Sequence, residues 1–153
     1  MAKYFPQEKG FSCGASALRN CLSHFGITLT EAYLRKVCNT NKDDGTSFDD
    51  LYEASQNYFD VNEIVSISPN VFQRRITKGL KNGKVYIISV DNHQHWISCV
   101  EYYNRKVKII DSDWEKGVVH WITMRQLVEM SFCYDKNSDR KEFLALELIY
   151  EKK

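Results

Sequence analysis

The chemistry that this sequence could perform rests on four polar side chains, Gln7, Cys13, His95 and Asp111. A cysteine thiolate is a strong nucleophile, and a histidine can take up the thiol proton and return it. A carboxylate can orient the imidazole and stabilise its charged form, and an amide can donate to the oxyanion that forms when a carbonyl is attacked. Together, these four groups could perform acyl transfer through a cysteine.

The surroundings of Cys13 favour a reactive thiol. Ser12 precedes a run in which apolar residues recur at helical spacing and stop at Gly26, which predicts a helix that begins near Cys13. The unpaired N–H groups and the positive dipole end of a helix N-terminus favour thiolate over thiol. We expect the small residues at 14–16 to leave the sulfur uncrowded, and Cys21 on the same helix to be a buried, inert thiol.

His95 and Asp111 flank two β-rich runs. Residues 96–103 and 105–110 are separated by a turn at Asn104, which predicts an antiparallel hairpin. A turn centred near residues 103 and 104 would place Asp111 across from His95 to within one residue, and the β-carbons of such neighbours are about 5 Å apart. We therefore expect Asp111 to orient His95 as the base for Cys13.

Other assignments are open at this point. His93 would face the same side as His95 but falls in the polar connection 91–94, and Asp113 is a rival for the carboxylate. His93, His95 and Cys99 could be drawn as metal ligands, although no fourth ligand has suitable spacing. The alternative interpretation of the glutamine is an exposed loop side chain. We expect neither a metal nor another cofactor.

The remaining patterns predict helices first and an antiparallel sheet afterwards, which is typical of the α+β class. Capping-box spacings predict three short helices, and continuous or alternating apolar runs predict strands. The expected helices span residues 28–37 (Thr28 with Glu31), 47–55 (Ser47 with Asp50), 71–80 and 123–130 (Thr123 with Gln126), and the expected strands span 64–67, 85–90 and 143–150, the last with Leu144, Leu146 and Leu148 on one face.

Length and composition bound the function. A chain of 153 residues without linkers or repeats is expected to form one domain over residues 1–153. Its 21 basic and 20 acidic residues give a net charge of +1 and are scattered, which argues against a nucleic acid or membrane partner. No membrane segment or secretory signal is visible, so we expect a cytoplasmic protein. An odd set of five cysteines without a C-x-x-C pair argues against disulfides or a zinc knuckle.

The segment from Gln7 to Leu18, QEKGFSCGASAL, resembles the active-site opening of the bacteriocin-processing double-glycine peptidases and their stand-alone relatives. These enzymes are a branch of the papain-like cysteine peptidases. The resemblance covers nearly the whole chain, because residues 45–51 look like the family's second capped helix, residues 95–97 like its His-aromatic-apolar strand start, and residues 109–111 like the strand that ends in its catalytic aspartate. Ser112 departs from the family, which usually has proline there.

The resemblance implies a papain-like fold, with N-terminal helices packed on a C-terminal antiparallel sheet. It implies that Cys13 is the nucleophile, His95 the general base and acid, Asp111 the orienting carboxylate and Gln7 the oxyanion donor. The implied reaction is peptide-bond hydrolysis through a thioester, without a cofactor, on a peptide or protein with small residues such as Gly-Gly before the scissile bond. The exporters' transporter segments are absent, which favours peptidase activity over export.

Two points stay open in the sequence. The aromatic residues Trp96, Trp114 and Trp121 could wall a substrate groove or belong to the core. The same four groups would also serve an isopeptidase, a peptidyl transferase or a deamidase. A catalytically silent peptide-binding domain is the alternative from another class. We infer no oligomeric state.

Overall fold

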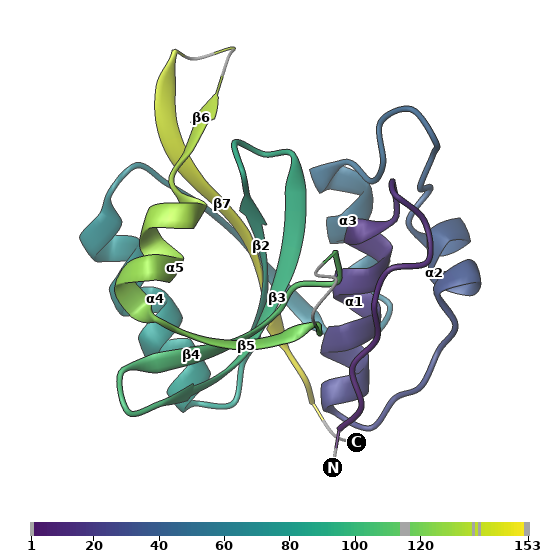
Figure 1. The fold of residues 1–153 in the computed structure, drawn as a ribbon, viewed down its shortest axis with the longest axis horizontal. Helices are drawn as coiled ribbons and strands as arrows, with labels where there is room; N and C mark the ends of the chain where they lie inside the picture. The colour runs from purple at the N-terminus through teal and green to yellow at the C-terminus, as the bar shows by residue number, and fades with distance from the viewer. Residues whose placement is uncertain (1, 114–116, 136, 138, 152–153) are drawn as a thin grey trace.

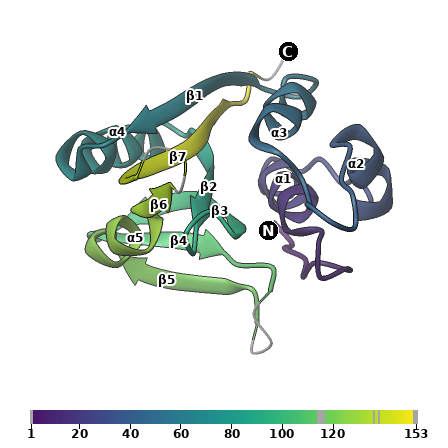
Figure 2. The ribbon, with the colours of Figure 1, turned by 90° about the horizontal axis from the view of Figure 1, so that it is seen from above.

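An antiparallel sheet lies between two groups of helices in the computed structural model, which describes residues 2–113, 117–135, 137 and 139–151. The strand order is β1-β7-β2-β3-β4-β5, and β6 pairs with β7. Helices α1, α2 and α3 pack on one side of the sheet, and α4 and α5 pack on the other (Figures 1 and 2). The elements are α1 (Cys13–His24), α2 (Glu31–Val37), α3 (Phe48–Ser55), β1 (Asp60–Ser66), α4 (Pro69–Lys81), β2 (Val85–Val90), β3 (His95–Tyr103), β4 (Lys106–Ile110), β5 (Val119–Thr123), α5 (Met124–Ser131), β6 (Cys133–Asp135) and β7 (Arg140–Ile149).

The central strand β2 shows why the chain forms two cores. All six of its residues are buried, as its continuous apolar run predicts. Val85 and Ile87 face the cluster formed with α1, α2 and α3, whereas Tyr86 and Ile88 face the cluster formed with α4 and α5. The alternation of a strand therefore gives each helical layer its own apolar face, and the predicted α+β arrangement is confirmed.

Helix α1 begins at Cys13 and ends where the sequence predicts. Gly26 adopts a φ of 82° and donates its N–H to Ser23, while Ile27 donates to Leu22, both at 3.0 Å. This left-handed C-terminal motif is one that glycine adopts without strain. The helix packs against β3, where the Ser98 hydroxyl donates to the Ala17 carbonyl at 2.8 Å. Cys13 is thereby fixed at the end of a well-anchored helix.

The predicted start of α2 is wrong by two residues. Thr30, not Thr28, is the N-cap residue, and its hydroxyl accepts from the Tyr33 N–H at 3.2 Å. Glu31 then becomes the first helical residue and is fully buried. The capping-box interpretation fails because Thr30 caps the helix, while the Glu31 carboxylate contacts the N-terminal loop and Arg35.

The caps of α3 and α5 follow the prediction. The Ser47 hydroxyl accepts from the Asp50 N–H at 3.1 Å. Thr123 and Gln126 form a reciprocal capping box. Strand β1 starts at Asp60, earlier than its apolar residues indicate, because its whole length pairs with β7. Of the predicted apolar face of β7, Leu146 and Leu148 lie in the core on the α1 side.

The predicted β3–β4 hairpin exists, but its register differs by two to three residues next to the turn and by one to two residues beyond a bulge. The turn consists of Asn104 and Arg105, both with positive φ (52° and 64°), so that Tyr103 pairs with Lys106. Such a two-residue turn matches the twist of the strands. A bulge between Cys99 and Glu101 shifts the pairing once more. No helix in the described part of the chain is long and apolar enough to cross a membrane.

The packing of α4 against β2 leads to a test. A Cβ atom at Gly79 would lie 1.5 Å from the Tyr86 hydroxyl, which donates to Glu147 at 2.8 Å. Gly79→Ala should therefore lower the free energy of unfolding by about 1–3 kcal/mol in urea denaturation, although glycine to alanine in a helix ordinarily adds up to about 1 kcal/mol. The exposed neighbour provides the control, since Lys78→Ala should change the stability by less than about 0.5 kcal/mol. A stabilised Gly79→Ala variant would contradict this packing.

Candidate active site

The N-terminus of α1 and the start of β3 open onto one cleft. The cleft has a volume of about 820 Å³. The four side chains singled out in the sequence all line it, together with Gly10, Val90, Asp91, Gln94, Asp113 and Met130. Gln7 arrives from the extended N-terminal segment, which runs beside α1 (Figure 1), and Asp111 directly follows β4. Four groups from distant parts of the chain are thus brought together.

His95 and Asp111 are joined directly. The His95 Nε2 and Asp111 Oδ1 atoms are 2.7 Å apart, and the two side chains are 16% and 15% exposed. Ser98 pairs with Ile110, and continuing this register places Asp111 opposite Ile97. His95 is two residues from Ile97 and points to the same face of the sheet, so its contact with Asp111 is diagonal. Since Nε2 faces Asp111, Nδ1 is the ring nitrogen left for another partner.

The electrostatics favour a charged imidazole. Burial alone would lower the pKa of His95, but its hydrogen bond with Asp111 and the nearby Cys13 side chain outweigh burial and raise the pKa to about 10. Burial alone would raise the pKa of Asp111. The hydrogen bond from His95 and the one from the Asp113 N–H outweigh burial, so the pKa is lowered overall. Both shifts describe an imidazolium held between a carboxylate and a thiol.

Cys13 differs from the other cysteines. It is partly exposed at the first position of α1, while the other four are buried. Burial raises the pKa of Cys21 to about 12, in agreement with the expectation of an inert thiol. Burial also raises the pKa of Cys38 to about 12. The accessible thiol is therefore the one that lies beside His95.

The small residues after Cys13 have a packing role. A Cβ atom at Gly14 would lie 2.8 Å from the Thr46 Cβ and 3.3 Å from the Trp96 ring. Ala15 and Ser16 are fully buried. These residues allow α1 to pack closely against its neighbours, while Cys13 itself stays partly exposed.

Gln7 is held on both of its sides. Its backbone N–H donates to the Ser112 carbonyl at 2.9 Å, and the Ser112 hydroxyl donates to Gln7 Oε1 at 3.0 Å. Gln7 Nε2 donates to the carbonyls of Lys9 at 2.8 Å and Gly10 at 3.4 Å. The sequence shows Ser112 as a departure from the family's proline, but it does not predict that the Ser112 hydroxyl binds Gln7. A proline could supply the carbonyl and not the hydroxyl.

His93 and Asp113, the alternative candidates for the base and the carboxylate, make other contacts. The Ser89 hydroxyl is 2.7 Å from His93 Nδ1, and His93 Nε2 lies 3.5 Å from the Glu142 carboxylate. The backbone N–H of Asp113 donates to Asp111 at 3.2 Å, so this residue supports the carboxylate that it could have replaced. Within the described ranges, no group of three His, Cys, Asp or Glu side chains is arranged to hold a metal ion.

Trp96 and Trp121 line different hollows. Trp96 lines a second hollow of about 480 Å³ that also reaches Cys13, and it stacks on Phe48 with ring centroids 6.1 Å apart. Trp121 on β5 is 44% exposed and lines another hollow, to which Cys13 does not contribute. Trp114 lies outside the described residues.

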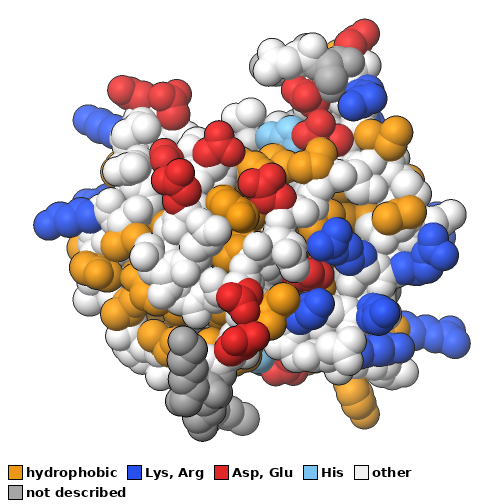
Figure 3. All heavy atoms as spheres, turned by 180° about the vertical axis from the view of Figure 1, so that it is seen from behind, with side chains coloured by type: hydrophobic (Ala, Val, Ile, Leu, Met, Phe, Trp, Pro, Cys, Tyr) orange, Lys and Arg blue, Asp and Glu red, His pale blue; other side chains and the backbone are white. Residues whose placement is uncertain are grey.

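The charges on the surface are less evenly spread than their scatter along the sequence suggests. Seen from behind, acidic side chains are numerous across the upper part of the molecule, and most lysine and arginine side chains lie toward the lower right, with others at the left edge (Figure 3). The cleft itself is lined by Asp91, Asp111 and Asp113, and by no lysine or arginine of the described chain. A ligand of this cleft therefore meets a negative environment.

The contact between His95 and Asp111 can be tested without any substrate. Asp111→Asn removes the carboxylate that raises the His95 pKa, while burial, which lowers it, remains. An NMR titration of the imidazole should therefore give a pKa well below the value of about 10 in the unaltered protein. Asp113→Asn is the matched control and should leave the titration in place, since Asp113 contributes its backbone N–H. An unshifted Asp111→Asn titration would show that the two side chains are not paired.

Comparisons with known proteins concern the family and the fold. The profile of the Peptidase C39 family matches residues 1–126. No curated protein sequence matches the chain. A double glycine motif protease from an AMS/PCAT transporter, crystallised in complex with the leader peptide, superposes with a TM-score of 0.68 at 19% identity, over 100% of this chain and 93% of that one.

Two further structures are peptidase domains of ComA. That of Streptococcus ComA, a bi-functional ABC transporter involved in a quorum sensing pathway, superposes with a TM-score of 0.67 at 19% identity, over 97% of this chain and 99% of that one. That of Streptococcus mutans ComA has a TM-score of 0.58 at 18% identity, over 94% and 96% of the two chains. At these identities the superpositions show a shared fold, while the family profile covers most of the sequence. The chain thus belongs to the peptidase C39 family of papain-like cysteine peptidases.

Proposed function

We propose that this cysteine peptidase hydrolyses peptide bonds with a triad of Cys13, His95 and Asp111, and that Gln7 stabilises the oxyanion. The observation that supports the triad most strongly is the 2.7 Å contact of His95 with Asp111 in the cleft where Cys13 begins α1. The orienting carboxylate occupies Nε2, so Nδ1 exchanges the proton with the thiol.

In the first half of the reaction, the Cys13 thiolate attacks the carbonyl carbon of the scissile bond. The oxyanion accepts hydrogen bonds from Gln7 Nε2 and from the Cys13 backbone N–H, which has no intrahelical partner at the first position of α1. The contact of Gln7 with the Gly10 carbonyl, at 3.4 Å, is long for a hydrogen bond and is the one that the oxyanion replaces. The C–N bond breaks as His95 protonates the leaving amine, and a thioester remains.

In the second half, His95 takes a proton from water as the water attacks the thioester carbonyl. The C–S bond then breaks, the acid product leaves, and the thiolate and imidazolium are restored. The Asp111 carboxylate stabilises the imidazolium in both halves, consistent with the raised pKa of His95, about 10. No cofactor takes part in these steps.

We propose a peptide or protein as the substrate, with small residues such as Gly-Gly before the scissile bond. A structural neighbour was crystallised with a leader peptide, which supports peptide binding. The stacked rings of Trp96 and Phe48 form an aromatic wall in the hollow next to Cys13, which would restrict the size of side chains bound there. Isopeptidase, peptidyl transfer or deamidation would use the same groups, since only the acceptor and pocket differ. A silent binding domain would not need all four groups.

We also propose a single domain over residues 1–153 in a cytoplasmic protein. The first strand pairs with the last, and the N-terminal helices pack on the same sheet. All five cysteines are free, as expected in a reducing compartment.

The assignment of roles is tested by cleavage of a Gly-Gly peptide followed by mass spectrometry. Cys13→Ala and His95→Ala should abolish cleavage, and Gln7→Ala should lower kcat by about 10²–10³, or about 3 kcal/mol in the barrier. Cys21→Ala, a change in the same helix, should keep the kcat per folded molecule. Alkylation by iodoacetamide separates an enzyme from a silent domain, because modification of Cys13 should depend on His95. Cleavage by Cys13→Ala, or labelling of Cys13 that ignores His95, would contradict the proposal.

The pH dependence follows from His95. Its pKa is raised to about 10, so the imidazolium that protonates the leaving amine is present below that pH and is lost as the pH rises through it. The rate of cleavage should therefore fall at the alkaline end near pH 10. In Asp111→Asn the fall should begin at lower pH, because the residue that raises the pKa is gone. An alkaline limit that is the same in both proteins would exclude His95 as the group responsible.

The acidic lining of the cleft predicts a preference among substrates. Peptides with lysine or arginine beside Gly-Gly should be cleaved with a higher kcat/KM than peptides with glutamate there, because opposite charges favour association. The difference should shrink as salt increases from 0.01 to 1 M, since screening shortens the range of the field to about 3 Å. Asp91→Asn should reduce the preference as well. Equal rates for basic and acidic peptides at low salt would refute this charge selection.

A further inference from the structure

We propose that Glu31 is a positioning residue, which holds the loop bearing Gln7 and the start of the helix bearing Cys13 in their working geometry. The inference rests on the proposed function, because it assigns to Glu31 an effect on the oxyanion donor and the nucleophile. It concerns a carboxylate outside the cleft that contacts neither of them directly.

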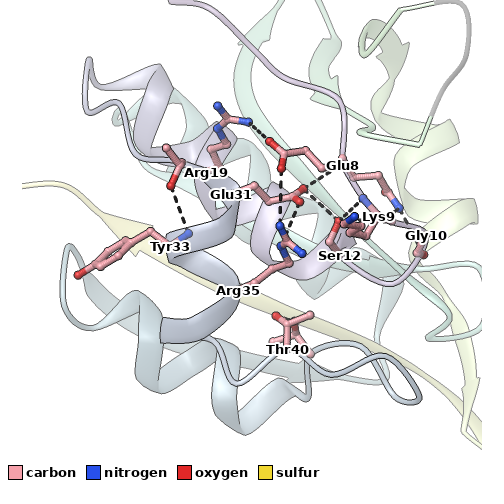
Figure 4. Close-up of polar contacts among 12 residues, drawn as sticks. Glu8, Lys9, Gly10, Ser12, Arg19, Glu31, Tyr33, Arg35 and Thr40 are labelled. Atoms are coloured by element: carbon pink, nitrogen blue, oxygen red, sulfur yellow. Dashed lines mark hydrogen bonds and ion pairs between the residues drawn. The ribbon is translucent and has the colours of Figure 1, made fainter.

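One oxygen of Glu31 bridges the two segments (Figure 4). Glu31 Oε1 accepts from the Glu8 backbone N–H at 2.9 Å and lies 3.0 Å from the Ser12 hydroxyl. Glu8 directly follows Gln7, and Ser12 directly precedes Cys13. A single atom at the start of α2 is thus bonded next to the oxyanion donor on one side and next to the nucleophile on the other.

The loop between these two contacts is closed by its own hydrogen bonds. The Ser12 hydroxyl accepts from the Lys9 N–H at 3.0 Å, and the Lys9 carbonyl accepts from the Ser12 N–H at 3.1 Å. The same Lys9 carbonyl accepts from Gln7 Nε2 at 2.8 Å. The amide of Gln7 is therefore oriented by a loop that Glu31 fixes.

Ser12 is the N-cap residue of α1, but its side chain does not cap the helix. A serine at an N-cap ordinarily accepts from the N–H groups of the first helical turn, but the Ser12 side chain makes no such bond. It is engaged with Lys9 and Glu31 instead. The N–H groups at the start of α1 are consequently left for the Cys13 thiolate and for the oxyanion.

The charge of Glu31 points to the same role. The residue is 0% exposed, and a buried carboxylate is costly unless it is paired and hydrogen-bonded. Arg35 Nε lies 3.4 Å from Glu31 Oε2, and Arg35 also approaches Glu8 at 3.6 Å. Buried ion pairs add little to stability compared with apolar packing, whereas they fix one arrangement among several. We infer that this one fixes the loop.

The test compares three variants by the kcat for each active site, counted by stoichiometric alkylation of Cys13. Glu31→Ala removes the bridging acceptor and should lower this kcat by about tenfold to a hundredfold with KM within about twofold, as expected for small misplacements of reacting groups. Glu31→Gln keeps an acceptor oxygen but loses the charge that pairs with Arg35, so its kcat should lie between that of Glu31→Ala and that of the unaltered protein. Glu8→Gln is the matched control, because it alters ion pairs to Arg19 and to Arg35, which is also the partner of Glu31, but removes no acceptor from the loop.

The outcomes are distinguishable from a failure of the proposed function. A purely structural role would lower the melting temperature and the number of alkylated sites but leave the kcat for each site unchanged, which would overturn the inference. The rate of Cys13 alkylation serves if the unaltered protein cleaves no peptide. Glu31→Ala should slow alkylation about threefold as Ser12 returns to capping the helix. An unchanged alkylation rate in that case would overturn the inference independently of peptide cleavage.

Discussion

The hydrogen bond between His95 and Asp111 is the interaction on which the rest of the site depends. It joins the first residue of β3 to the residue that directly follows β4 at 2.7 Å, so its geometry is set by two neighbouring strands of the sheet. With Nε2 directed at the carboxylate, the pKa of the imidazole is raised despite burial, and Nδ1 is the ring nitrogen left for Cys13. The sheet thereby sets both the orientation and the protonation of the ring.

The other half of the site comes from the helical layer and is assembled differently. Cys13 is fixed by α1, whose anchoring on β3 joins the two layers at the cleft. Gln7 lies in an extended segment without regular structure, and it keeps its place through Ser112 on the sheet side and the loop held by Glu31 on the helix side. The His95–Asp111 pair and the hydrogen-bonded N-terminal segment thus place their side chains in one cleft, as catalysis by orientation requires.

Much of the fold and part of the site could be predicted from local sequence patterns. The helix that begins at Cys13, the buried strand β2 and the capping box of Thr123 with Gln126 each follow from spacings within a few residues, and the structure confirms them. The meeting of His95 and Asp111 was also predicted, but through a wrong register. The alternation along the strands keeps the two residues on one face even when the pairing shifts by two residues. The predicted contact of His95 with Asp111 therefore forms in the observed register as well.

What could not be predicted depends on contacts between distant residues. The inward turn of Glu31, the hydroxyl of Ser112 on Gln7 and the close packing of Gly14 on Thr46 have no signature in the sequence around each residue. A capping-box spacing even pointed to the wrong start of α2, because a buried partner in the N-terminal loop competes for the carboxylate. Tertiary hydrogen bonding overrides local preference where the site is assembled.

The central claim is that Cys13 and His95 act on each other, and an NMR titration of the His95 imidazole in Cys13→Ala tests it most directly. The nearby thiol contributes to the raised pKa of His95, about 10 in the unaltered protein, and its removal should lower that pKa. Identical titrations with and without the sulfur would contradict the account, because they would show that the two side chains do not share a proton.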